Sequence, residues 1–257
     1  MKESTKQNWD TFWDQKADTK EVYANTDRIR RNLARNLDLR GKRILEVGAG
    51  TGRDSFYMAQ DGAELVLLDY SMNSLKIIRT LLPSTDHISA VGGDAFALPF
   101  PDGSFDAVFH QGLLEHFRKD DARRLLEENV RVLRTGGLLV VDVPQRWHIY
   151  TAIKHTLIAL NAWFAGWERE FSVAELRNLL KELGLQPVDV YGEWMYPSLI
   201  YRTMREAFFK LGVKLPLYPR LIPPISRLRE KIRNGLDGSV VKINTALSIG
   251  VIAKKLT

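Results

Sequence analysis

The sequence predicts an α/β protein built on a mostly parallel sheet with helices on both faces. Two features of its 257 residues support this prediction. Short apolar runs alternate with amphipathic helical stretches, which is the pattern of parallel strands joined by crossover helices. Several runs end in a glycine or a carboxylate, and ligands of such sheets bind at the carboxyl ends of the strands. The composition, 45% hydrophobic and 26% charged, is that of a folded chain.

Five strands are expected in the first part of the chain. The first ends in the glycine-rich turn at 48–52, and the second ends at Asp69. An N-terminal helical region precedes them, with Trp9, Phe12 and Trp13 in one apolar group. The expected strands are 43–47, 65–68, 88–91, 105–109 and 138–143, and the expected helices are 3–37, 53–60, 74–82 and 121–133.

The pattern changes after Pro144. Residues 147–167 are rich in aromatic side chains and are expected to be helical. Ser172 and Glu175 predict a capping box, in which the serine accepts from the Glu175 amide and the glutamate reaches back. The helix that they open should stop at Gly184. Two further strands are expected at 185–191 and 246–253.

Residues 197–245 separate these last two strands and are too long for a simple connection. They hold five of the ten prolines. We expect an inserted lid or substrate-binding segment. The predicted domain organisation is an N-terminal helical cap at 1–40, a core at 41–196 and 246–257, and a basic insertion at 197–245.

The basic excess of the chain is confined to its last fifth. Residues 202–257 contain 12 Lys and Arg against 3 Asp and Glu, a net charge of +9, whereas residues 1–201 have a net charge of −3. An anionic partner is therefore expected near the insertion and not on the core.

The sequence excludes several kinds of chemistry and predicts a location. It has no cysteine, which rules out disulfides, thiolate zinc sites and a cysteine nucleophile. Its five histidines lack metal-binding spacing, so no metal is expected. The polar start of the chain does not resemble a secretory signal, and no apolar stretch approaches about 18 residues. We therefore expect a cytoplasmic protein, with a peripheral position at the membrane surface as the alternative.

The glycine-rich turn and the carboxylate after it suit a nucleoside ligand. Glycines let the backbone pass close to a ligand, and the following helix offers free amides to an anion. Asp69, at the end of the second strand, is placed to accept from both hydroxyls of a ribose. It lies 21 residues after Gly48, a spacing that also fits a dinucleotide fold.

The ordered set of motifs resembles the class I S-adenosylmethionine-dependent methyltransferases over about 9–191, most strongly over 44–143. The motifs are ILEVGAGTG, LLDYS, GDAFALPFPDGSFDAV, LLEHF and RVLRTGG. The resemblance implies a Rossmann-like class I methyltransferase fold, a seven-stranded and mostly parallel sheet whose last strand is antiparallel, with the basic insertion between strands six and seven. It also implies S-adenosyl-L-methionine as cofactor and S-adenosyl-L-homocysteine as product.

The same resemblance implies roles for individual residues. The glycines would contact the methionine part of the cofactor, with its amino group oriented through the turn by Glu46. Asp69 would hold the ribose, and Asp94 would accept from the adenine amino group. A helix with Trp13 and Tyr23 would cap the site. The implied cofactor-binding residues are Glu46, Gly48, Ala49, Gly50, Gly52, Asp69, Tyr70, Asp94, Ala95, His110 and Gln111.

Methyl transfer itself mainly requires alignment of the nucleophile, the methyl carbon and the sulfur. A base is needed only where the acceptor must lose a proton. His148 and His116 are the candidate catalytic residues. Other groups on the substrate side are Tyr150, His155, Glu168 and Glu170. Many relatives carry a histidine where this sequence has Trp167, so a base is not carried over from the family.

Other functions remain open from the sequence. A nicotinamide-dependent oxidoreductase shares the glycine turn and the ribose carboxylate, but the Asp94-Ala95 segment and the RTGG turn disfavour it. A non-catalytic module that keeps the fold and binds a partner or a membrane through 197–245 is the alternative of another class.

The insertion bears on the substrate. Between 202 and 242 its cations are interleaved with apolar side chains, a pattern that suits a solvated lid, capture of an anionic or lipid-like molecule, contact with a membrane surface, or RNA binding. Nucleic acid is disfavoured, because no RNA-binding motif accompanies the pattern. We expect a small or lipid-like methyl acceptor, either anionic or neutral. The oligomeric state is not predicted.

Overall fold

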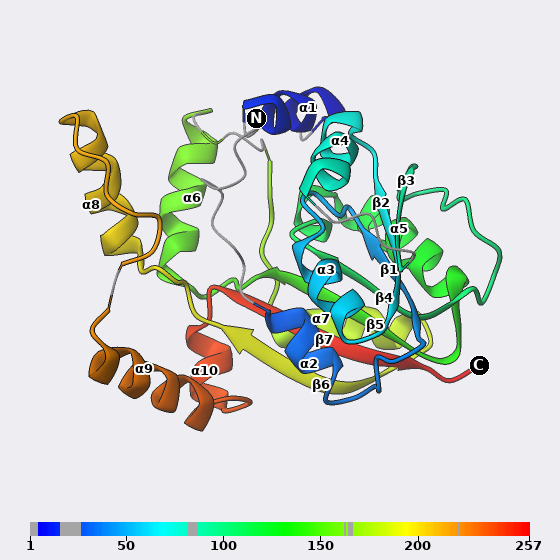
Figure 1. Ribbon diagram of the computed structural model, residues 1–257. Helices are drawn as coiled ribbons and strands as arrows, with labels where there is room; N and C mark the ends of the chain where they lie inside the picture. The colour runs from blue at the N-terminus through cyan, green and yellow to red at the C-terminus, as the bar shows by residue number, and fades with distance from the viewer. Residues whose placement is uncertain (1–4, 16–26, 82–86, 162, 164–166, 220) are drawn as a thin grey trace.

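The computed structural model describes residues 5–15, 27–81, 87–161, 163, 167–219 and 221–257, which build one sheet with helices around it (Figure 1). The sheet has seven strands in the order β3-β2-β1-β4-β5-β7-β6. All neighbouring pairs are parallel except those that β7 makes with β5 and β6. The strands are β1 (Arg43–Val47), β2 (Glu64–Asp69), β3 (Ile88–Gly92), β4 (Phe105–Gln111), β5 (Leu133–Pro144), β6 (Leu185–Glu193) and β7 (Ser248–Lys255).

The predicted fold class is confirmed, including the antiparallel last strand. The parallel neighbours β1 and β4 mark the point where the strand order reverses. Strands β2 and β3 are added on one side of β1, and the later strands are added on the other side. At such a switch point two loops leave in opposite directions and open a crevice beyond the strand ends. The glycine turn follows β1, so the order of the strands places that turn at the crevice.

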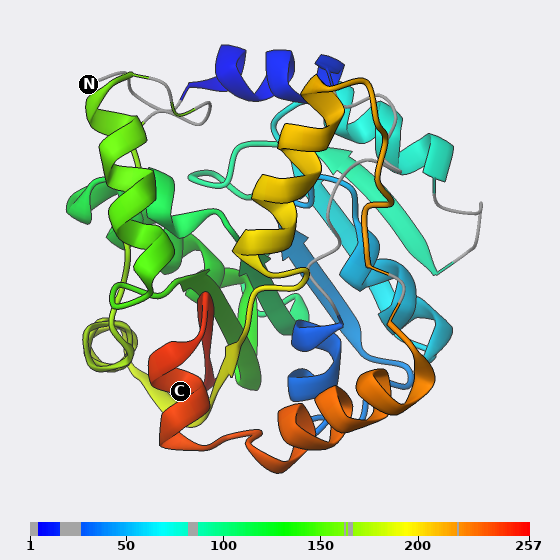
Figure 2. The same ribbon diagram turned by 90° about the vertical axis from the view of Figure 1, so that its left-hand side faces the viewer.

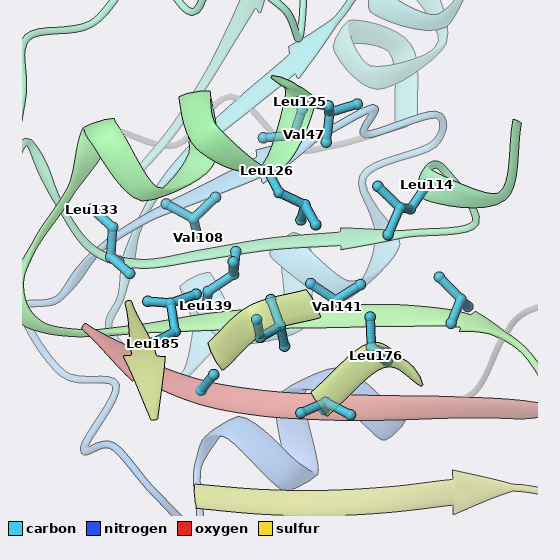
Figure 3. Close-up of a cluster of buried hydrophobic side chains, with 14 of the residues drawn as sticks. Val47, Val108, Leu114, Leu125, Leu126, Leu133, Leu139, Val141, Leu176 and Leu185 are labelled. Atoms are coloured by element: carbon cyan, nitrogen blue, oxygen red, sulfur yellow. The ribbon is translucent and has the colours of Figure 1, made fainter. Parts of the chain in front are cut away.

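Two layers of helices cover the sheet. Side chains of α2 (Arg28–Leu33), α3 (Arg53–Gln60) and α4 (Met72–Leu81) are buried on one face. Those of α5 (Lys119–Val132) and α7 (Val173–Glu182) are buried on the other, where Leu125, Leu126 and Leu176 belong to one buried cluster with Val108 and Leu139 (Figure 3). Burial of both faces explains why the central strands are apolar along most of their length.

Some predicted elements differ in extent. The predicted helix 3–37 contains α1 (Lys6–Gln15) and α2, and residues 16–26 lie outside the described part of the chain, as do Leu82 and Tyr23. The predicted helix 147–167 is shorter, because α6 is Ile149–Ala159. It ends before Asn161, a non-glycine residue with a φ of 52°.

The predicted capping box at the start of α7 is half correct. The Ser172 hydroxyl accepts from the Glu175 amide at 3.2 Å. The Glu175 carboxylate does not reach back, since it accepts from Arg146 at 2.5 Å and also from Arg169. Two guanidinium partners outcompete one backbone amide.

The segment between β6 and β7 is helical. It contains α8 (Leu199–Lys210), α9 (Pro223–Gly235) and the short α10 (Val240–Thr245). Together with α6 these helices lie on one side of the molecule, turned toward the viewer in Figure 2. None of the helices that the structure describes combines the length and the hydrophobicity that a membrane-spanning segment needs.

Candidate cofactor and acceptor site

A large cavity lies beyond the carboxyl ends of the central strands. Its volume is about 1210 Å³, which exceeds the range of about 300–1,000 Å³ usual for one small ligand. The loops after β1, β2 and β4 form its floor, and side chains of α1, α6 and α8 complete its walls. The cavity therefore has room for two molecules side by side.

The glycine turn after β1 forms part of the floor. Gly48, Gly50 and Gly52 have φ values of 69°, 55° and 65°, which are strained for other residues. A Cβ atom built on Gly50 would lie 2.9 Å from the Trp13 ring. The turn thus requires glycine for its backbone angles and, at Gly50, for the close approach of α1.

Asp69 ends β2 beside this turn. Its carboxylate accepts from the amides of Gly50 and Ser71, each at 2.8 Å. Burial raises the pKa of Asp69, while the two amides act in the opposite direction. Each carboxylate oxygen has a second lone pair, and the residue lines the cavity. The side chain is held in place by the backbone and can still accept from a ligand.

Glu46 lies at the end of β1, beneath the turn, and also reaches the cavity. Its carboxylate accepts from the Ser55 hydroxyl at 2.5 Å. Burial raises the pKa of Glu46 well above its ordinary value, and Asp54 and Asp69 add to that rise. A cationic group in the cavity would lower the pKa of Glu46 again, since a nearby positive charge favours the ionised carboxylate.

The loop after β3 forms another wall. Asp94 and Ala95 line the cavity, as does the exposed Tyr70 across from them. One Asp94 oxygen accepts from the Phe96 amide at 2.9 Å, which fixes the carboxylate at the rim. This wall offers an acceptor, a backbone amide and an aromatic ring, the set that an adenine ring can use.

Comparison with known proteins bears on residues 45–141, which include the glycine turn, Asp69 and Asp94. Residues 45–141 match the family model described as "Methyltransferase domain". A demethylmenaquinone methyltransferase of Renibacterium salmoninarum is 43% identical over 101 residues, which is 39% of this chain and 40% of that protein. A protein of Mycolicibacterium smegmatis named "Probable S-adenosylmethionine-dependent methyltransferase" is 31% identical over 59% of this chain and 55% of its own.

Residues 45–141 thus resemble a methyltransferase domain. The predicted resemblance to S-adenosylmethionine-dependent methyltransferases is confirmed over this stretch. The matches span only about half of the length of these relatives. They therefore characterise the matched stretch and do not bear on the rest of the chain.

Solved structures agree on the fold. An S-adenosylmethionine-dependent methyltransferase of Archaeoglobus fulgidus superposes with a TM-score of 0.58 at 17% identity, covering 89% of this chain and 91% of that one. One from Mesorhizobium loti also gives 0.58, at 18% identity, with 90% and 99% covered. At these identities the likeness concerns the fold alone.

The residues of the methyltransferase domain suit the family's cofactor, S-adenosylmethionine. The Gly50 cradle has no room for a Cβ atom, and the buried Oε1 of Gln111, which lines the cavity, has no hydrogen-bond partner among the described residues. Carboxylates of Glu46 and Asp69 face the same space. An amino group, a ribose and a sulfonium are all complemented by acceptors of this kind.

Most of the predicted cofactor residues line the cavity, but two do not. Gly52 precedes α3, and His110 lies within β4 with no exposure to solvent. Burial lowers the pKa of His110 to about 3, so the ring is neutral. Gly52 and His110 therefore lie behind the lining residues and do not contact the cavity. The predicted residues that line it are Glu46, Gly48, Ala49, Gly50, Asp69, Tyr70, Asp94, Ala95 and Gln111.

The far end of the cavity, beneath α6, carries a buried charge cluster. The Lys154 ammonium lies 2.7 Å from a carboxylate oxygen of Glu168 and 2.7 Å from one of Glu170. Trp163 donates to Glu168 at 2.7 Å, and His155 pairs with Glu170 at 2.6 Å. The pKa of Lys154 is raised, because these two carboxylates outweigh the effect of burial.

Glu115 and His116 lie beside this cluster and line the cavity. Burial, with repulsion from Glu168, raises the pKa of Glu115 to about 8, so that side chain is protonated at neutral pH. Burial lowers the pKa of His116, whose Nδ1 lies 3.8 Å from Glu168, and the Trp9 ring of α1 packs on it with ring centres 4.9 Å apart. His116 is thus a neutral imidazole at the cavity wall.

His148, the other candidate base, lies elsewhere. Its Nδ1 accepts from the Tyr150 amide at 3.1 Å, which caps the start of α6, and it is not among the cavity-lining residues. Capping is a structural use of the ring.

Sequence reasoning missed several residues of the cavity wall. Arg28 pairs with Asp142 through two bonds of 2.8 and 2.7 Å, both groups being buried. Lys154 was missed because a lysine in an aromatic helix resembles any surface lysine until its partners are known. Asp142 could have been found, since it lies at the carboxyl end of β5, where site residues of such sheets gather. Arg53 and Arg202 also line the cavity.

Proposed function

We propose that the protein transfers the methyl group of S-adenosylmethionine to a small or lipid-like acceptor bound beneath α6 and α8. The observation that carries this proposal is the continuity of the cavity. One end has the glycine turn and Asp69, and the other has the Lys154 cluster, with Trp9, Phe12 and Leu157 along its walls. Two ligands can therefore meet inside it, away from water.

Residues at the first end would bind and orient the cofactor. Asp69 would accept hydrogen bonds from the ribose hydroxyls, and Glu46 would orient the amino group through the turn. Asp94 and the Ala95 amide would form hydrogen bonds with the adenine. Arg53, at the start of α3, is placed to pair with the carboxylate. When bound, the cofactor supplies a methyl group on a cationic sulfur, and the protein's task is alignment.

The acceptor end combines an apolar wall with a few fixed charges. Leu157, Trp163 and Leu199 supply apolar area, Arg202 contributes a cation, and Lys154 is paired with the carboxylates of Glu168 and Glu170. Relatives named demethylmenaquinone methyltransferase support a quinone-like, lipid-soluble acceptor, and this cavity suits that class. The atom that is methylated is left open among oxygen, nitrogen and carbon.

His116 is proposed as the group that takes a proton where the acceptor has one to lose. It lines the cavity as a neutral imidazole, because burial lowers its pKa. The Glu168 carboxylate, 3.8 Å from Nδ1, would stabilise the imidazolium that forms. Glu115 is protonated at neutral pH, so it cannot serve as that base.

Calorimetric titration with S-adenosylmethionine, S-adenosylhomocysteine and NAD tests the cofactor. Binding of the first two without NAD is expected. No binding of S-adenosylmethionine at millimolar concentration would refute the proposal, and binding of NAD would favour an oxidoreductase.

Turnover is tested by mass spectrometry with a soluble demethylated quinone analogue and with a panel of phenols and amines. A product heavier by one methylene is expected, and His116→Gln should lower kcat about 100-fold while leaving cofactor affinity unchanged. Cofactor binding with no methylated product from any acceptor would favour the non-catalytic binding module instead.

A further inference from the structure

Exposed apolar side chains gather on one side of the molecule. Of the 21 large hydrophobic residues that are exposed in the described part of the chain, 16 lie at 147–160 or 200–241. These ranges cover α6, α8, α9 and α10 with their flanks, and two views at right angles place the four helices on the same side (Figures 1 and 2). Apolar exposure that is concentrated in this way marks an interaction surface.

Helix α8 has two different faces. Leu199, Thr203 and Glu206, spaced by four and three residues, line the cavity. The outward stripe is apolar and recurs at intervals of four, four and three, so its members share one face of the helix. Their exposed fractions are 81% for Ile200, 41% for Met204, 40% for Phe208 and 77% for Leu211.

Helix α9 repeats the pattern further from the site. Ile225, Leu228 and Ile232 form one exposed stripe, and no residue of this helix is buried. Arg227 and Lys231 are exposed on the same helix, four residues apart. None of these five residues lines the cavity. The stripe residues stay 48–58% exposed in the described part of the chain, so this apolar face is available to contact a partner.

Charge identifies the partner. Residues 202–242 contain ten Lys and Arg against three Asp and Glu. Lys242 is buried against Asp237, and the exposed cations of the segment include Lys210, Lys214, Arg227 and Lys231. Cores of protein–protein interfaces are depleted of lysine and of charge, whereas apolar stripes mixed with cations suit the boundary between lipid headgroups and acyl chains. We propose that α8 and α9 form a docking surface for an anionic lipid bilayer, in which the apolar stripes enter the interface and the cations meet lipid phosphates.

This proposal deepens the proposed function, because a bilayer would supply a lipid-like acceptor. Tyr150 and Leu157 of α6 and Leu199 of α8 line the cavity from the inside, while the outer faces of the same two helices carry exposed apolar residues. An acceptor that left the bilayer between α6 and α8 would pass from one apolar surface to another and arrive at the cluster around Lys154.

Vesicle co-sedimentation tests the docking surface without any turnover. The intact protein should bind vesicles of phosphatidylcholine with phosphatidylglycerol, bind poorly to phosphatidylcholine alone, and be released by salt. The double variant Arg227→Glu/Lys231→Glu should bind at least about tenfold more weakly. The matched control is Arg177→Glu/Lys181→Glu on α7, where two exposed cations have the same spacing, and it should bind like the parent chain.

The apolar stripe has its own variant, Ile225→Ser/Leu228→Ser/Ile232→Ser, which should also lose vesicle binding while calorimetry shows unchanged affinity for S-adenosylmethionine. Equal binding of the parent chain and both α9 variants to anionic vesicles would overturn the proposal, as would no binding by the parent chain. A dimer in sedimentation velocity that the serine variant dissociates would assign the surface to a second copy. Since vesicle binding needs neither cofactor nor acceptor, its failure is distinct from failure of the methyltransferase proposal.

Discussion

Individual residues of the cofactor end owe their identity to backbone geometry as much as to chemistry. Gly50 illustrates this, because its φ of 55° and the Trp13 ring 2.9 Å from a built Cβ impose two separate demands. Glu115 illustrates the opposite case, in which burial beside a charge cluster changes the chemistry of an ordinary carboxyl. Each case leads to a measurable consequence.

Gly50→Ala should weaken binding of S-adenosylmethionine at least about tenfold, because the added methyl group collides with Trp13 and displaces α1 from the site. Gly41→Ala is the matched control. Its φ of 69° imposes a similar backbone strain of about 1 kcal/mol, but its Cβ would meet nothing within 4 Å. Both variants should lose similar stability in urea unfolding, and only the first should lose affinity in calorimetry. Equal affinities would show that α1 does not close on the turn.

Glu115 should make the cofactor-free protein less stable as the pH rises. Its pKa is raised from 4.5 to about 8, so the folded state keeps a proton that the unfolded state loses between these values. Glu115→Gln, which is always neutral, should therefore gain stability over the parent chain by at least about 1 kcal/mol at about pH 9, and gain little at about pH 5. Urea unfolding at the two pH values provides the measurement. A pH-independent difference would place the charge of Glu115 in contact with water.

At the scale of elements, helices of the core and of the insertion differ in what holds them. Helix α7 is capped by Ser172 and buries Leu176 and Leu180, whereas α8 is capped by Ser198 and buries no residue. The first is therefore part of the cooperative fold, and the second depends on its cap and its few contacts. Amphipathic sequence alone does not separate the two cases, because both helices have one apolar stripe.

Ser172→Ala should lower the global free energy of unfolding by about 1 kcal/mol, the usual cost of a lost N-cap. Ser198→Ala removes the same kind of bond, at 3.4 Å from the Tyr201 amide, but should leave global unfolding nearly unchanged and speed local amide hydrogen exchange in α8. Urea unfolding and exchange measured by mass spectrometry distinguish the two effects. An equal loss of global stability in both variants would show that α8 unfolds with the core.

At the scale of the whole molecule, the two halves of the cavity come from different parts of the chain. The cofactor end is contained in 45–141, the stretch that matches the family model. The acceptor end combines Glu115 and His116 with side chains of α1, α6 and α8, helices that are separated by more than a hundred residues in places. The match to the family model therefore bears on the cofactor end and does not extend over α1, α6 and α8.

Local signals in the sequence, namely apolar runs, glycines and a carboxylate at a strand end, were enough to predict the succession of strands and helices along the chain. The family resemblance of contiguous motifs added the antiparallel closing strand and the expected cofactor residues. The structure was needed to show that Lys154, Glu168 and His116 converge, that His148 caps a helix, and that the helices between β6 and β7 leave apolar stripes exposed. Contacts of this kind join residues far apart in the chain, and burial and pKa follow from neighbours that no sequence spacing specifies.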